Sequence, residues 1–373
     1  MAKQFSIDQK SLFSLLNSMQ PICSKRTTLD TTTAILFQVS HRELVLKSTD
    51  LEISMQASCT VGSSTLTEGE SFLVPGKRIF DVVKEFEGNV ICSLKSNQLA
   101  LQAGSVKMML NIQDAQEFPP FPERIENLMH IETALLASML EKVSFLIPQN
   151  SPNGALTGLF LEITDREMKM TATDGHCLAQ ARTSKYTLPQ SRSWLIPRRA
   201  IFELKKIIDA MKEPLIFVGT CGNQLVFSGE SFNFFTKVLA DQFPAYEAVL
   251  DKTEFLPAQI DRASFSKTLR RSTSLLSGQF LATQFEFATD TVHVALTNKE
   301  VGTLDEQVAV EGYTGAKIDM RFYAPYVLSG LQALPDEQVT FFLKNSTRPL
   351  IFESQSNDVA MTYLVMPVSV SSH

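Results

Sequence analysis

The chain has 373 residues and a formal net charge of -6 at pH 7, with 44% hydrophobic and 20% charged residues. This length favours two or three domains over a single core, and the composition excludes a disordered chain. The negative charge excludes a protein that coats nucleic acid through a uniformly basic surface, although a local basic surface is still allowed.

Compartment and redox state follow from two further features of the sequence. No apolar run approaches the roughly 20 residues that cross a bilayer, and the start MAKQFSIDQK has no apolar signal core. We therefore expect a cytoplasmic protein without membrane contact. The cysteines are odd in number, far apart and without a C-x-x-C pair, so we expect reduced thiols at Cys23, Cys59, Cys92, Cys177 and Cys221.

Three predicted helices begin alike, at Ile7, Ile131 and Ile260, with the sequences IDQKSLFSLL, IETALLASML and IDRASFSKTL. In each, an acidic residue follows the isoleucine, and apolar residues stand five and nine positions after it. This spacing predicts one buried helix face, with the acid in or near the first turn, where the helix dipole favours it.

Each predicted helix is followed by a segment of alternating apolar and polar residues, AILFQVSHRELVLKSTDLEISMQ, GLFLEITDREMKMTATDGHCLAQ or TQFEFATDTVHVALTNKEVGTLDEQ. This alternation predicts a strand, a hairpin and a further strand. Equally spaced along the chain are the pairs Thr49-Asp50, Thr173-Asp174 and Thr297-Asn298. The segments are therefore in register with one another.

A second helix is predicted in each unit, from VPGKRIFDVVKEF, IPRRAIFELKKII and YAPYVLSGLQAL, with Pro75, Pro197 or Pro325 at its start. Closing strands follow and end near Pro119, Pro244 and Pro367. We interpret the chain as three copies of one α+β domain, residues 1–125, 126–253 and 254–373, with helices on one face of antiparallel sheets. The order within each copy suggests two similar halves.

The stretch TATDGHCLA places Asp174, His176 and Cys177 close together, as a nucleophile with its base would be. One hypothesis is therefore a hydrolase or transferase that uses these three residues. The repeat favours a turn instead, because Asp174 corresponds to Asp50 and Asn298, and an aspartate can bond nearby backbone N–H groups. His176 corresponds to glutamates and Cys177 to aliphatic residues in the other copies, and a surface binding role for His176 stays open.

Other signatures of catalytic sites are missing from the sequence. It contains no phosphate-binding glycine loop, no H-E-x-x-H pair and no G-x-S-x-G elbow. His41, His130, His293 and His373 are isolated and lack metal-ligand spacing. We expect no cofactor and no metal.

Basic residues concentrate on several predicted helices of this acidic chain. Solvated helix faces would explain any one of them. Repeats stacked side by side would instead bring equivalent helices to one positively charged surface. The basic residues are Lys25, Arg26, Lys77, Arg78 and Lys84, then Arg198, Arg199, Lys205, Lys206 and Lys212, and finally Arg262, Lys267, Arg270 and Arg271.

Four short motifs carry a resemblance to a known family: TDLEI at Thr49, ATDGHCLA at Ala172, QFPAY at Gln242 and YLVMP at Tyr363. In their order and spacing they resemble the bacterial DNA polymerase III beta subunit, the replicative sliding clamp. The resemblance implies a homodimeric ring of six similar domains, with helices lining a central hole. Such a ring is not an enzyme. It encircles duplex DNA and tethers the polymerase III catalytic subunit, the clamp loader and other clients through short apolar peptides.

The resemblance also implies three sets of site residues. A peptide pocket would include Leu156, Thr173, Gly175, His176, Leu178, Pro244, Val249, Phe280, Tyr326, Val365, Met366 and Pro367. DNA would face Arg26, Lys77, Arg78, Arg198, Arg199, Lys205, Lys206, Arg270 and Arg271. The dimer interface would join Ser105–Ile112 of one chain to Leu275, Leu276 and Glu300–Glu306 of another, with Lys107, Met108, Leu275, Leu276, Glu300 and Glu306 among its residues.

The sequence departs from the family at several pocket positions. Cys177, Ala248 and Ser369 stand where basic residues are common, and Tyr323 and Pro349 where smaller polar residues are usual. We therefore expect a less basic pocket with its own peptide preference, and an exposed Cys177 would be oxidisable. A protein-binding scaffold without a nucleic-acid role is a further hypothesis. The client proteins, their affinity and the opening of the ring are left open by the sequence.

Overall fold

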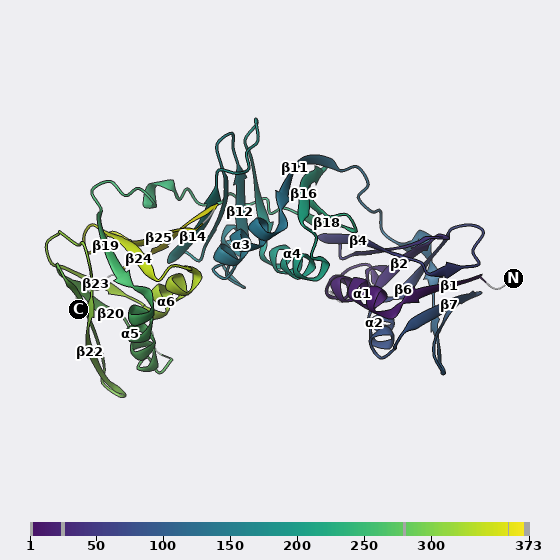
Figure 1. Cartoon of the computed structure of the whole chain (residues 1–373), viewed down its shortest axis with the longest axis horizontal. Helices are drawn as coiled ribbons and strands as arrows, with labels where there is room; N and C mark the ends of the chain where they lie inside the picture. Colours follow the sequence, from purple (N-terminus) through teal and green to yellow (C-terminus); the bar gives the residue numbers. More distant parts are fainter. Residues whose placement is uncertain (1–2, 24–26, 279–280, 357, 369–373) are drawn as a thin grey trace. The chain divides into compact units, whose positions relative to one another are not determined.

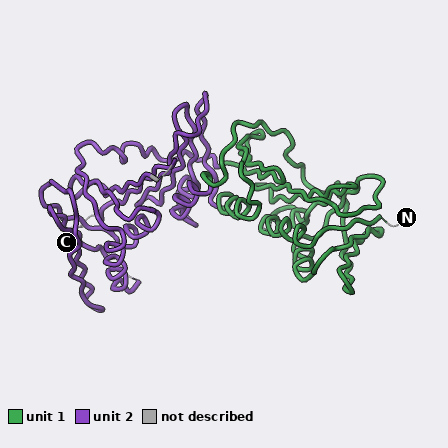
Figure 2. The backbone as a smooth tube through the Cα atoms, in the orientation of Figure 1, with its two compact units in different colours: residues 1–136, 199–238 green, residues 137–198, 239–373 purple. Residues whose placement is uncertain are grey.

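The structure is a computed structural model and describes residues 3–23, 27–278, 281–356 and 358–368 (Figure 1). The chain divides into two compact units (Figure 2). The first unit contains residues 1–136 and 199–238, and the second contains residues 137–198 and 239–373. The predicted middle domain contributes segments to both units, and its limits stay a prediction.

The first unit contains two antiparallel sheets. Its strands are β1 (Lys3–Asp8), β2 (Ala34–Val39), β3 (Glu43–Thr49), β4 (Ile53–Thr60), β5 (Ser63–Ser64), β6 (Glu70–Pro75), β7 (Asn89–Lys95), β8 (Gln98–Ala103), β9 (Val106–Asn111), β10 (Gln113–Asp114), β11 (Glu126–Glu132), β16 (Leu215–Cys221), β17 (Gln224–Ser228) and β18 (Phe232–Lys237). A five-stranded sheet has the order β5-β1-β7-β8-β9. A nine-stranded sheet has the order β10-β6-β2-β3-β4-β18-β17-β16-β11.

The helices of the first unit are α1 (Gln9–Cys23), α2 (Gly76–Lys84) and α4 (Arg198–Met211) from Arg199 on. The predicted apolar face of α1 is buried, since Leu12 and Leu16 have no exposed surface. Just before the helix, the Asp8 carboxylate accepts a hydrogen bond from the Ser11 amide at 3.0 Å. This bond lowers the pKa of Asp8 and satisfies one free N–H of the first turn.

The second unit also has two antiparallel sheets. Its strands are β12 (Gly158–Ile163), β13 (Met168–Thr173), β14 (Cys177–Thr183), β15 (Arg192–Pro197), β19 (Leu256–Asp261), β20 (Thr283–Phe287), β21 (Thr291–Asn298), β22 (Gly302–Ala309), β23 (Ile318–Phe322), β24 (Gln338–Leu343), β25 (Leu350–Ser356) and β26 (Val359–Val365). An eight-stranded sheet has the order β15-β12-β13-β14-β26-β25-β24-β19, and a four-stranded sheet the order β22-β21-β20-β23.

The helices of the second unit are α3 (Thr133–Ser144) from Ala137 on, α5 (Arg262–Ser274) and α6 (Ala324–Ala333). Asp261 caps α5, because its carboxylate accepts a hydrogen bond from the Ser264 amide at 2.7 Å. Phe265 and Leu269 are fully buried, as the repeat predicts. The α-helices and antiparallel sheets of the described residues, in this order, confirm the α+β fold with a threefold repeat.

Consecutive repeats are joined by strand pairing. In the first unit β4 pairs with β18, so that Ile53 lies opposite Thr236. In the second unit β14 pairs with β26, so that Cys177 lies opposite Val365. Because Ile53 and Cys177 are equivalent in the repeat, the two junctions are built in the same way.

Two kinds of feature are absent from the described residues. No helix among them is long and apolar enough to cross a membrane. No group of three or more His, Cys, Asp or Glu side chains among them could hold a metal ion.

Candidate peptide and DNA sites

The Asp/His/Cys cluster forms a turn between β13 and β14. The Asp174 carboxylate accepts hydrogen bonds from the amides of His176 at 2.8 Å and Cys177 at 2.7 Å. Gly175, which has a φ of 91°, permits the tight reversal of the chain. The predicted role of Asp174 in the turn is confirmed.

The same turn recurs in the other two repeats. Asp50 accepts from the amides of Glu52 at 3.0 Å and Ile53 at 2.8 Å. Asn298 accepts from the Glu300 amide at 3.0 Å. An aspartate or asparagine at this position therefore serves the backbone in every repeat.

Cys177 is buried, with 1% of its surface exposed. Burial raises the pKa of its thiol to about 12, so the thiolate that a nucleophile requires is not formed near neutral pH. Within the described part of the chain, no hydrogen bond joins the His176 ring to Asp174 or Cys177. Because β26 covers Cys177, the conditional case of an exposed and oxidisable thiol does not apply.

The exposed His176 lies at the edge of a group of apolar residues. Its ring stacks on Tyr326 of α6, with centroids 5.6 Å apart. Its carbonyl accepts a hydrogen bond from the Met366 amide at 2.9 Å. The Met366 side chain is 38% exposed, and Leu156 lies within van der Waals reach of Gly175. The structure thus brings five of the predicted pocket residues together, all within the second unit.

Other predicted pocket residues lie beneath this surface or beside it. Leu178 belongs to a buried cluster against which Val249 packs. Thr173 and Val365 are buried, Pro244 is exposed and Pro367 is partly buried. Phe280 and Ser369 lie outside the described residues.

Two further tyrosines pack in this region: Tyr323, which stands at a predicted pocket position, and Tyr363, for which the sequence predicted no role. Tyr323 meets Tyr326 edge to face, with centroids 5.0 Å apart. The hydroxyl of the fully buried Tyr363 donates to the Tyr326 carbonyl at 3.0 Å. The signal for Tyr363 was its place in the YLVMP motif, where its side chain alternates inward.

Five of the nine predicted DNA-facing cations have partners among the described residues. Arg198 donates from Nε to the Ile147 carbonyl at 3.0 Å, and Lys206 reaches both carboxylate oxygens of Glu203 at 3.1 Å. The ammonium of Lys205 lies 5.9 Å from the ring centroid of Phe202. Arg271 pairs with Glu306 and holds the pKa of that carboxyl below its ordinary value.

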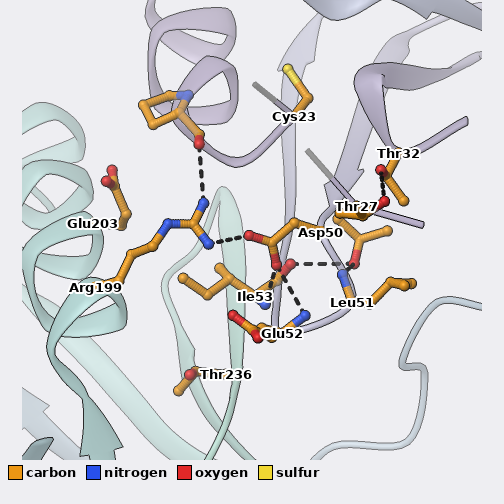
Figure 3. Close-up of polar contacts among 12 residues, drawn as sticks. Cys23, Thr27, Thr32, Asp50, Leu51, Glu52, Ile53, Arg199, Glu203 and Thr236 are labelled. Carbon is orange, nitrogen blue, oxygen red and sulfur yellow. Dashed lines mark hydrogen bonds and ion pairs between the residues drawn. The ribbon is translucent and has the colours of Figure 1, made fainter. Parts of the chain in front are cut away.

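Arg199 has the most enclosed partner among these cations. Figure 3 shows its guanidinium directed at Asp50, whose carboxylate is fully buried. It also donates to the Pro21 carbonyl of α1 at 3.1 Å. Arg199 was predicted to face DNA, and its contact with Asp50 instead ties α4 to the first repeat.

Lys77, Arg78 and Arg270 differ from these residues. All three are exposed, and no carboxylate in the described part of the chain lies within 4.0 Å of their charged groups. Arg26 lies outside the described residues.

The predicted interface strand β9 is an exposed sheet edge. Val106, Met108 and Met109 are 50%, 40% and 51% exposed, and Lys107 between them is exposed as well. The second predicted interface segment includes β22, which is the edge of the four-stranded sheet and carries Glu306. Leu276 was predicted in the interface but is only 4% exposed, because it packs inside its own unit.

Comparisons with known proteins cover nearly the whole chain. Family models match residues 3–122, 130–245 and 249–369, described as the N-terminal, central and C-terminal domains of the DNA polymerase III beta subunit. Relatives named "Beta sliding clamp" include that of Staphylococcus aureus strain Mu50, 25% identical, and that of Pseudomonas putida strain KT2440, 26% identical. Each comparison covers 98% of this chain and 99% of the relative.

Solved structures show the same fold. The DNA polymerase III beta subunit of Pseudomonas aeruginosa superimposes with a TM-score of 0.89 at 24% identity, over 98% of this chain and all of that one. The subunit of Thermotoga maritima gives 0.88 at 22% identity, over 99% of this chain and all of that one. The chain belongs to the DNA polymerase III beta subunit family, the bacterial sliding clamps.

Proposed function

We propose that the protein encircles duplex DNA as a homodimeric ring and tethers DNA polymerase and other clients to it. The relatives named as sliding clamps support this function. The turn geometry of Asp174 and the buried thiol of Cys177 argue against the hydrolase or transferase hypothesis. The single observation that carries the proposal is a pair of sheet edges, β9 and β22, that the repeat leaves unpaired within one chain.

The two junctions within the chain predict how these edges meet. In the repeat β22 is equivalent to β4 and β14, and β9 is equivalent to β18 and β26. The internal partners of β4 and β14 are β18 and β26, so β22 should pair with β9 of the partner subunit. Two such contacts close a ring of two chains.

The register of this pairing also follows from the repeat. Val301 stands where Ile53 and Cys177 stand in the other copies. The hairpin pairs Gln98↔Asn111 and Gln224↔Lys237 place Leu110 where Thr236 stands. We therefore expect Leu110 opposite Val301 of the partner subunit. The exposed Met108 and Met109 would be covered there, which explains apolar residues on an open edge.

Two helices carry cations that have no partner among the described residues, and these cations supply the attraction for DNA. Arg78 and Lys84 lie on α2, and Lys267 and Arg270 on α5, all of them exposed. Flexible cations without a fixed counterion attract phosphates without reading bases, as sliding requires. Arg199 is excluded from this set because Asp50 holds it.

The apolar group around His176 is the proposed docking site for client peptides. Stacked aromatic rings and the adaptable Met366 side chain suit apolar anchors of a flexible segment. Ordering that segment offsets part of the gain from burial, so an affinity on the order of micromolar is expected. Such affinity allows clients to exchange on one ring.

Retention on DNA tests the central proposal. The protein is placed on closed circular duplex DNA with a clamp loader, and its release is followed before and after a restriction enzyme cuts the circle. A topological ring stays on the circle and slides off the linear form. Equal release from both forms would show that the protein does not encircle DNA, and would favour the scaffold hypothesis.

A further inference from the structure

A second groove lies in the second unit between α3 and α6, apart from the group around His176. Its volume is about 470 Å³. Ser138, Glu141, Lys142 and Phe145 line one side, and Ser329, Gln332 and Leu334 line the other. Neither His176 nor Met366 contributes to it, so it is a separate feature of this unit.

Phe145 forms a fixed aromatic platform in this groove. It is 41% exposed, yet its ring stacks on Tyr363, with centroids 6.1 Å apart and planes inclined by 25°. Tyr363 cannot shift, because it is fully buried and a side chain at Gly330 of α6 would fall 2.1 Å from its ring. One part of the Phe145 ring is therefore packed and the remainder is open to a further ring.

Lys142 provides a cation beside this platform. Only 9% of the residue is exposed, and among the described residues no carboxylate lies within 4.0 Å of its ammonium. A largely buried lysine whose ammonium has no counterion among the described residues favours an anion. The neighbouring Glu141 is exposed to solvent, which screens its charge.

We propose that this groove binds one unpaired nucleotide of single-stranded DNA. The base would stack on Phe145, the phosphate would lie near Lys142, and Gln332 with the serine hydroxyls would face the base edge. Stacking on an aromatic ring with a cation beside it is how proteins hold single strands without sequence preference. A duplex keeps its bases inside the stack and offers none to Phe145. The proposal rests on the proposed function only in naming DNA as the ligand.

A tryptophan reporter tests the stacking directly. Trp194 is the one tryptophan of the chain, so Trp194→Phe combined with Phe145→Trp places the only indole in the groove. Oligothymidylate should quench this fluorescence, whereas an abasic oligomer of equal length and charge should not. The matched control is Trp194→Phe with Phe217→Trp, since Phe217 is 39% exposed in the first unit. Equal quenching by the abasic oligomer, equal quenching in the control, or no quenching would overturn the proposal.

Affinity measurements separate the two contacts. Phe145→Ala should weaken binding of oligothymidylate by roughly tenfold or more. Lys142→Gln should lower the slope of log K against log salt by about 0.7, the value for one phosphate of a single strand. Unchanged affinity in Phe145→Ala, or quenching by an apolar client peptide in place of DNA, would also overturn the proposal.

The retention assay on circular duplex DNA distinguishes this inference from the proposed function. Phe145→Trp should stay on closed circles as the unmodified protein does. If the protein is retained on circles but shows no base-dependent quenching, only the proposal of a nucleotide site is rejected. If the unmodified protein is not retained on closed circles, the clamp proposal is rejected, whatever the tryptophan fluorescence shows.

Discussion

Arg199 of the second repeat lies against the buried carboxylate of Asp50 in the first (Figure 3). One oxygen of Asp50 shapes its own turn through the amides of Glu52 and Ile53. The other oxygen meets Arg199, which also reaches the Pro21 carbonyl. A single aspartate thus links a local turn to the contact between two repeats.

Removal of Arg199 should destabilise the first unit. Arg199→Ala leaves the Asp50 carboxylate buried without its partner. Because the arginine itself is partly exposed, we expect a loss of roughly 2 to 3 kcal/mol in the free energy of unfolding, below the range for fully buried pairs. Urea unfolding measures it. The matched control is Lys206→Ala on the same helix, whose side chain is 62% exposed where it pairs with Glu203, so its loss should be smaller than that of Arg199→Ala.

Asp50→Asn should be milder than Arg199→Ala. Asparagine makes this turn in the third repeat, so the backbone bonds persist while the charge is removed. In the double variant the two losses should not add, since both remove one interaction. Fully additive losses in a double-mutant cycle would show that Arg199 and Asp50 do not act together.

Met109→Glu should produce folded monomers. Met109 is 51% exposed on the edge strand β9, so the change leaves the separate chain intact but puts a charge into the proposed contact with β22 of the partner subunit. Solution mass at low concentration and the thermal midpoint are the two readouts. Leu276→Asp should instead lower the midpoint, because Leu276 is buried in its own unit. A dimeric Met109→Glu variant would place the interface elsewhere.

Lys77→Glu should weaken the same dimer. Lys77 occupies the position in α2 that Arg199 occupies in α4, so in a closed ring it should approach the Asn298 turn of the partner subunit. A charge reversal there opposes the acidic residues of that segment. Lys84→Glu on the same helix is the control and should leave the dimer unchanged. If both variants dimerise equally well, the contact between subunits is not built like the contacts between repeats within one chain.

Truncation of Met366 should weaken client binding. Met366→Ala removes an exposed wall of the group around His176, and we expect a loss of roughly 1 to 3 kcal/mol with the dimer unchanged. His176→Ala removes the ring that stacks on Tyr326 and should have a similar effect. Titration of a labelled polymerase-derived peptide measures both, with Met129→Ala in the first unit as the control. Unchanged peptide affinity in both variants would show that the docking site does not lie at this turn.

Thiol reactivity should follow burial. Burial raises the pKa of Cys23, Cys92 and Cys177 to about 12, so none of the three should react with iodoacetamide at neutral pH before unfolding. The neutral Cys177 thiol stabilises the fold fully below its ordinary pKa of 9.0, and this contribution is lost as the pH rises toward 12. The stability difference between the unmodified protein and Cys177→Ala should therefore shrink in that interval. A rapidly alkylated native Cys177 would contradict the burial.

The sequence alone was sufficient to predict the features that depend on residues close together in the chain, namely the buried helix positions and the turns. Apolar spacing located the buried residues Leu12, Leu136 and Phe265 of three helices, and the recurrence of Thr-Asp and Thr-Asn pairs identified the turns. These features need only local geometry, because an aspartate bonds amides two and three residues away. Because the chain contains three copies of one domain, the same pattern could be read at three places, and this made the fold predictable.

Tertiary structure decided which residues far apart in the chain become partners. In the sequence Arg199 cannot be distinguished from an exposed basic residue. Folding brings it into contact with Asp50, which is 149 positions away along the chain. Cys177 and Leu276 are buried by segments whose placement no periodicity encodes. The groove with Lys142 and Phe145 likewise exists only because α6 lies beside α3. Burial and charge pairing depend on these long-range contacts, and a single sequence carries no direct record of them.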